Sequence, residues 1–285
     1  MIVELLSLFT ALCYGASSIL ARKGMKESNP MTGVIIGSLV QAALLAILVI
    51  ADPPDAFNWT AVGFFVAAGI LASTLGRLFN FTSIDRLGVA LAASIIGSSP
   101  LFSTLLAAVF LGEKIDAATL FGTVLVVVGI AVARSGGKVV KELRSSVLLL
   151  PIASAIFYGA SSVTRKAALN ILPESAFGAL VGAIASLTIY STYLLVSRRT
   201  GELRVNWGSG RFWLANGVVV TLAWLSMFTA LTNGKVSVVS SLGGTSPLFS
   251  VILSAILLKG SEDLNSRIVA GSLAIVAGAM VITLF

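Results

Sequence analysis

The chain has 285 residues, of which 57% are hydrophobic and 11% charged, and it carries a net charge of +7 and a mean hydropathy of +1.01. Because soluble domains hold about a quarter charged residues, this composition excludes an ordinary water-soluble fold and indicates an integral membrane protein. With no histidine and a single cysteine, Cys13, the chain lacks the commonest general base and the residues for a thiolate metal cluster, so we expect no catalytic residues, metal or cofactor.

Apolar windows follow one another along nearly the whole chain, and each is close to the roughly 20 residues that cross a bilayer core. They predict an all-α membrane protein with ten transmembrane helices, at residues 3–22, 31–51, 60–84, 87–111, 116–134, 146–169, 174–197, 212–232, 235–258 and 264–284.

Two motifs each occur twice, in the same order. Tyr-Gly-Ala-Ser-Ser at 14–18 returns at 158–162, and Ser-Pro-Leu-Phe-Ser at 99–103 returns at 246–250. This pattern indicates a tandem duplication, with repeats at 1–135 and 146–285 and a basic cytoplasmic linker at 136–145. Because each repeat holds an odd number of predicted helices, the second must enter the membrane from the opposite side. The sequence thus predicts two inverted five-helix repeats around a central cavity.

The basic residues cluster at the ends of the predicted helices, so we expect no nucleic-acid partner. Connections after odd-numbered helices hold 14 Lys and Arg residues, whereas those after even-numbered helices hold four, namely Lys114, Arg165, Lys166 and Lys235. The positive-inside rule then predicts cytoplasmic odd-numbered loops, with both termini outside the cell membrane.

Several of these motifs resemble the EamA family of the drug/metabolite transporter superfamily. The first half carries the Tyr-Gly pair, the Ser-Pro-Leu-Phe sequence, Leu-Gly-Glu at 111–113, Gly122 and Gly129. The second half repeats Pro247, Gly271 and Gly278, but Leu-Lys-Gly-Ser-Glu at 258–262 replaces the triplet. The resemblance implies ten helices in two inverted bundles, alternating access, and transport of small metabolites, amino acids or drugs.

The repeated tyrosines and serines are the first candidates for a binding site. Tyr14, Ser17 and Ser18 fall on one helix face, and Tyr158, Ser161 and Ser162 fall on another. Hydrogen-bonding groups at membrane depth are expected to face a wet cavity or a partner helix. The alternative is helix packing, with the serine hydroxyls bonded back to the backbone.

Pro100 and Pro247 lie near the middle of the fourth and ninth predicted helices. Because proline removes a backbone donor and clashes with the preceding turn, it predicts a hinge or a static kink. The residues around it are the candidate hinge positions Gly97 and Gly244 and the candidate substrate contacts Ser98, Ser99, Thr245 and Ser246.

Arg77 is the most unusual single residue, because it lies inside the third predicted helix. An intramembrane cation costs at least about 2.5 to 3.5 kcal/mol, so it should face a cavity and attract an anionic group. Alternatively it extends toward the cytoplasmic end of the helix or pairs with Asp85. Further cavity candidates are Asn80, Gln41 and Trp224, the last at the place in the second half that matches Arg77.

The leading hypothesis is a secondary transporter that moves a small metabolite, such as an amino acid or organic anion, across the cell membrane by alternating access, as an exporter or exchanger. Its expected partners are that solute and the lipid bilayer, and its oligomeric state stays open. A proton-coupled multidrug efflux carrier is the alternative, although the acidic residues sit only at helix ends. An intramembrane lipid-processing enzyme is a further alternative, although the sequence offers no nucleophile with a base.

Overall fold

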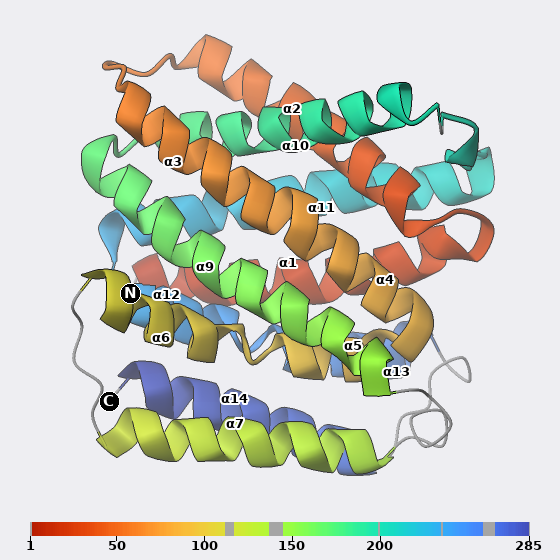
Figure 1. The fold of residues 1–285 in the computed structure, drawn as a ribbon, viewed down its shortest axis with the longest axis vertical. Helices are drawn as coiled ribbons and strands as arrows, with labels where there is room; N and C mark the ends of the chain where they lie inside the picture. The colour runs from red at the N-terminus through yellow and green to blue at the C-terminus, as the bar shows by residue number, and fades with distance from the viewer. Residues whose placement is uncertain are drawn as a thin grey trace.

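The computed structural model describes residues 2–111, 117–136, 145–198, 200–234, 236–258 and 266–284, and every regular element in these ranges is a helix (Figure 1). The α-helices are α1 (Ile2–Gly24), α2 (Pro30–Ala51), α3 (Trp59–Gly69), α4 (Arg77–Leu87), α5 (Val89–Ile96), α6 (Ser99–Leu111), α7 (Ala117–Gly136), α9 (Leu149–Ile171), α10 (Ser175–Val196), α11 (Trp207–Asn233), α12 (Val236–Gly243), α13 (Ser246–Leu257) and α14 (Ser266–Leu284). Short 3₁₀ turns are η1 (Met25–Glu27), η3 (Ser145–Leu148) and η4 (Thr200–Glu202), and η2 (Ile70–Gly76) is a π-helical segment that joins α3 to α4.

Local sequence signals set several helix ends. Asn29, Asn58 and Asn206 precede α2, α3 and α11, and each side chain accepts a hydrogen bond from a backbone N–H of the first turn. Gly88 separates α4 from α5 with a φ of 79°, a conformation that favours glycine. These polar ends separate the apolar helices that the composition predicts.

Six helical stretches of the described residues are long and apolar enough to cross a membrane: Ile2–Glu27, Pro30–Ala51, Trp59–Leu87, Val89–Phe110, Ser175–Val196 and Trp207–Asn233. Shorter apolar helices lie at Phe121–Ala133, Ser246–Leu257 and Ser266–Val281, and α9 falls outside both sets. The remaining members of the ten expected spans fall on α7, α9, α12 with α13, and α14, so the count of ten stays a prediction. The chain starts and ends at the same end of the bundle (Figure 1).

The duplicated motifs contact each other across the two halves. A Cβ added to Gly15 in α1 would lie 2.6 Å from the Cβ of Phe249 in α13, and one added to Gly159 in α9 would lie 2.8 Å from the Cβ of Phe102 in α6. Each Tyr-Gly motif therefore packs on the Ser-Pro-Leu-Phe motif of the other half. This crossed packing explains why the two motifs recur together.

Small residues also bring other helices close. The helices α7 and α14 lie side by side at one edge of the bundle (Figure 1), where a Cβ on Gly271 would lie 2.6 Å from the carbonyl oxygen of Gly129. Gly69 of α3 faces Gly182 of α10 in a similarly close backbone contact. Such contacts are typical of helices that associate within a membrane.

The fourth and ninth expected helices are each two helices rather than one, which corrects the prediction of continuous helices at 87–111 and 235–258. Pro100 is the second residue of α6, and Pro247 is the second residue of α13. At this position no intrahelical N–H donor is needed, so the proline begins a helix instead of bending one. The backbone N–H groups of Ser98 and Thr245 close the preceding turns, each 3.1 Å from a carbonyl oxygen three residues earlier.

The third expected helix is also interrupted, because residues 70–76 form the π-helical η2 directly before Arg77. π-helical turns are rare in proteins, and many of those that do occur lie at functional sites. The matching helix of the second half, α11, is continuous over 27 residues. The expected linker at 136–145, the triplet at 111–113 and the sequence at 258–262 lie largely outside the described residues.

The crossed packing predicts a strong position dependence for added methyl groups. Gly159→Ala should lower the free energy of unfolding by about 1 to 3 kcal/mol, because the new Cβ would also lie 2.8 Å from the backbone nitrogen of Ser103. The matched control is Gly63→Ala at an exposed position of α3, where nothing lies within 4 Å of the added Cβ and stability should hold or rise. Thermal unfolding of both purified variants in detergent measures the difference, and equal midpoints would contradict the packing.

Candidate functional site

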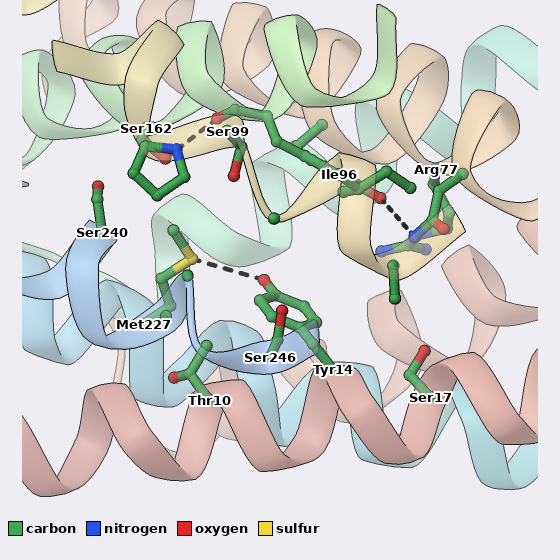
Figure 2. Close-up of a pocket in the computed structure, with 18 of the residues that line it drawn as sticks. Thr10, Tyr14, Ser17, Arg77, Ile96, Ser99, Ser162, Met227, Ser240 and Ser246 are labelled. Atoms are coloured by element: carbon green, nitrogen blue, oxygen red, sulfur yellow. Dashed lines mark hydrogen bonds between the residues drawn. The ribbon is translucent and has the colours of Figure 1, made fainter. Parts of the chain in front are cut away.

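A cavity of about 120 Å³ lies between the two halves of the chain. It is lined by α1, α4, α5 and α6 from the first half and by α9, α11, α12 and α13 from the second, with η2 adding one alanine. Thirteen of the residues predicted from the sequence line it: Tyr14, Ser17, Ser18, Arg77, Asn80, Gly97, Ser99, Pro100, Tyr158, Ser162, Trp224, Gly244 and Ser246. Figure 2 shows Tyr14, Ser99, Arg77 and Ser246 converging on this space.

Five other predicted residues lie behind the lining. Ser98 and Thr245 donate from their hydroxyls to the carbonyl oxygens of Ile95 and Leu242, each at 2.6 Å, and so help to end α5 and α12. Pro247 packs directly against Gly97. The last two, Gln41 and Ser161, bind the arginine side chains described below.

The serines of the repeated motif divide into two kinds. Ser18 and Ser162 donate to the carbonyl oxygens of Tyr14 and Tyr158, each at 3.1 Å, as the backbone-bonding alternative expects. Ser17 instead accepts a hydrogen bond of 2.8 Å from the side-chain amide of Asn216, which ties α1 to α11. The motif therefore supplies both helix packing and cavity wall.

Arg77 is 5% exposed and is held by neutral oxygens. Its Nη2 donates to Gln41 Oε1 at 2.9 Å and to Ser73 Oγ at 3.2 Å, and its Nη1 donates to Ser38 Oγ at 3.4 Å. Asp85 is exposed at the far end of α4, so the alternative of an Arg77–Asp85 pair is wrong. Arg77 lies inside the bundle, with two of its three acceptors supplied by α2 and the third by Ser73 of η2, one turn earlier.

Arg165 is a second buried cation at the cavity, and it is 2% exposed. Its Nη2 donates to Ser161 Oγ at 3.1 Å, and its Nη1 contacts the sulfur of Met227 at 3.0 Å. Its guanidinium carbon lies 4.8 Å from the ring centre of Trp224 and 4.6 Å from that of Phe228. These are cation–π distances.

The sequence prediction missed Arg165 as a site residue, because the charge count assigned Arg165 and Lys166 to a loop. Both lie inside α9, and Lys166 Nζ donates to the carbonyl oxygens of Leu231 and Gly234 at 2.8 and 3.1 Å. Arg165 and Lys166 therefore do not belong in the count of basic residues in the connections after even-numbered helices. The orientation of the loops stays a prediction. The signal was present in the spacing, since Arg165 follows Tyr158 by seven residues on the same helix face.

Trp224 lies close to both cations. The guanidinium carbon of Arg77 is 5.8 Å from its ring centre, so the residues at matching places in the two halves meet at the cavity. Nearby, the side-chain amide of Asn80 donates to the hydroxyl of Tyr158 at 3.3 Å. Among the described residues, every hydrogen-bond acceptor of the two guanidinium groups is neutral, so the cavity keeps uncompensated positive charge.

A family model described as the EamA-like transporter family matches residues 1–135 and 145–284. An uncharacterized transporter of Archaeoglobus fulgidus is 25% identical over all of this chain and 99% of its own, and YvbV, an uncharacterized transporter of Bacillus subtilis, is 24% identical over 95% and 88%. A solved crystal structure superposes with a TM-score of 0.72 at 18% identity, covering 99% of this chain and 98% of that one, which shows a shared fold.

The chain is therefore a multi-pass integral membrane protein of the transporter class. It belongs to the EamA-like transporter family, as the motifs of its sequence indicate. This membership and the names of its relatives point to a transporter rather than an enzyme.

The two arginines should respond differently to substitution. Arg165→Met should leave the free energy of unfolding unchanged or raise it by up to about 2 kcal/mol, because it removes a buried cation with few partners. Arg77→Met should lower it by about 1 to 3 kcal/mol, because Gln41 Oε1 and two serine hydroxyls lose their donor. Denaturation of both variants in detergent measures the contrast, and a larger loss in Arg165→Met would contradict it.

Proposed function

We propose that the protein is a secondary transporter that moves a small solute with an anionic group, such as an amino acid or organic anion, by alternating access. The observation that carries the proposal is the pair of buried guanidinium groups, Arg77 and Arg165, at one cavity with neutral acceptors only. Taking a charge out of water costs several kcal/mol unless it is compensated, and an anionic solute supplies the compensation. An engineered cavity of about 150 Å³ holds benzene, so the volume here suits a compact metabolite.

The proposal includes ten spans in two inverted five-helix repeats. Three observations support this arrangement: the crossed contacts of Gly15 and Gly159, the two separate blocks matched by the family model, and the position of both chain ends at one end of the bundle. Inverted repeats give a carrier two equivalent ways to close around a central site. Each of these two movements would open the cavity to one side of the membrane, as an exporter or exchanger requires.

The helix breaks support both binding and movement. Ser99 and Ser246 are the first residues of α6 and α13, and both line the cavity. The N-terminus of a helix carries partial positive charge, which favours an anionic group beside it. The turns at Gly97 and Gly244 can absorb a change of angle between the paired half-helices, so we assign them the role of hinges.

The alternatives fit the cavity less well. A proton-coupled multidrug carrier would bind organic cations, which two buried arginines repel, and the cavity lining of the described residues includes no carboxylate. A lipid-processing enzyme would need a nucleophile beside a base, and the same lining offers serines with neither histidine nor a carboxylate.

Transport by proteoliposomes tests the proposal. Vesicles with the purified protein should take up or exchange radiolabelled amino acids or organic anions, and cationic solutes should not move. Arg77→Ala should reduce carboxylate transport about five- to tenfold, with less than about a twofold effect on neutral solutes, because the lost interaction is with charge. The screen is run with and without a pH gradient. Pumping of organic cations by that gradient, without anion movement, would contradict the proposal.

Pro100→Ala tests the hinge. Alanine restores an N–H that can extend α5 into α6, so exchange should slow several-fold while the unfolding midpoint changes little. Pro30→Ala is the matched control, since Pro30 also lies in the first turn of a helix, α2, and does not line the cavity. Equal exchange rates for the two variants would assign Pro100 a static role.

A further inference from the structure

The sulfur of Met227 lies between two strong hydrogen-bond donors. The hydroxyl of Tyr14 approaches it at 3.5 Å and Nη1 of Arg165 at 3.0 Å, and Figure 2 shows Tyr14 and Met227 meeting inside the cavity. A thioether is a weak acceptor, whereas a guanidinium group with a phenol hydroxyl suits a carboxylate oxygen. The pair of donors is thus poorly matched to the atom that they contact.

Two more polar atoms of residues that line the cavity have no partner. Nε of Arg165 and the hydroxyl of Ser240 are buried without a hydrogen bond, and both residues line the cavity. Ser240 lies on α12 and lines the same cavity as Met227, although its hydroxyl points away from the sulfur (Figure 2). Because buried polar groups in folded proteins are nearly always paired, these atoms indicate an acceptor that binds from the cavity.

We infer that the sulfur of Met227 occupies the position of a substrate carboxylate oxygen, and that the solute's carboxylate displaces it to bind Arg165 and Tyr14. This inference rests on the proposed function and names the group that binds and its direct ligands. A carboxylate has two oxygens in one plane, which can accept from the guanidinium fork and from a hydroxyl together. Ser240 also lines the cavity and offers a further donor for the bound group.

Met227 is suited to such displacement. Its side chain is unbranched and has three rotatable bonds, so it can take up another position when an anion arrives. Arg77 is different, because Gln41, Ser73 and Ser38 already accept from its guanidinium. Arg165 is therefore the direct anion ligand, and Arg77 adds positive charge from a fixed position.

Acetate is a probe small enough to test this subsite alone. The purified full chain in detergent is unfolded thermally with sodium acetate, with sodium chloride at the same concentration, and with acetamide as the neutral analogue. Acetate should raise the unfolding midpoint of the wild type above the chloride and acetamide values. Arg165→Gln should abolish this shift, and Tyr14→Phe should weaken the acetate Kd about fivefold.

Met227→Leu is the decisive variant, because leucine keeps an apolar side chain and cannot accept a hydrogen bond. Without acetate its midpoint should fall, since Tyr14 and Arg165 lose their shared acceptor. With acetate its shift should exceed that of the wild type, because the carboxylate no longer competes with sulfur. Met31→Leu is the matched control, since Met31 lies in the first turn of α2, does not line the cavity and should change neither value.

Three results would overturn the inference: no acetate shift in the wild type, an acetate shift that survives Arg165→Gln, or a Met227→Leu midpoint that falls equally with and without acetate. The same proteins in proteoliposomes separate this failure from that of the proposed function. If wild-type vesicles transport carboxylates and Arg165→Gln transports them equally well, the subsite is wrong and the transporter stands. If the wild type moves no anion or zwitterion, the proposed function itself fails.

Discussion

The cost of keeping two guanidinium groups away from water constrains the rest of this structure. Arg77 donates hydrogen bonds to three neutral oxygens from α2 and η2, so the protein solvates its charge in place of water. The charge of Arg165 is solvated only in part, because its partners are one serine hydroxyl, two aromatic rings and a thioether. A buried cation with so few strong partners destabilises the empty protein, and an anion that enters the cavity relieves that cost. The anion binding that we propose at Arg165 would therefore also stabilise the protein.

The crossed packing of the duplicated motifs brings together four of the helices that line the cavity beside these cations. Close approach at Gly15 and Gly159 brings the first helix of each half against the broken helix of the other. The cavity is lined by residues from both halves, so a movement of one half relative to the other would change its shape. The breaks before Pro100 and Pro247 lie close together, because Pro247 packs against Gly97, and both prolines begin helices beside the crossing points. The packing contacts and the suggested points of movement are consequently neighbours.

The sequence predicted the membrane class, the family and much of the cavity lining, because these follow from composition and from repeated motifs. It did not predict Arg165. The matching residue of the first half is Ala21, so the duplication gave no signal, and a cation near a helix end is usually a loop residue. The π-helical η2 was also missed, since its carbonyl oxygens are satisfied by side chains from other helices: Tyr190 donates to Thr74 and Ser154 to Gly76. The π-helical segment depends on tertiary contacts that local patterns do not contain, whereas for Arg165 the spacing from Tyr158 was the one local signal.

Accessibility of the cavity from each side of the membrane tests the central claim most directly. Ser240→Cys in a Cys13→Ser background places one thiol in the cavity wall, and a membrane-impermeant thiol reagent is added to either face of oriented vesicles. We expect labelling from both faces, with protection from each by a transported carboxylate solute. Labelling from one face only, unchanged by any solute, would contradict a central cavity that opens alternately to the two sides.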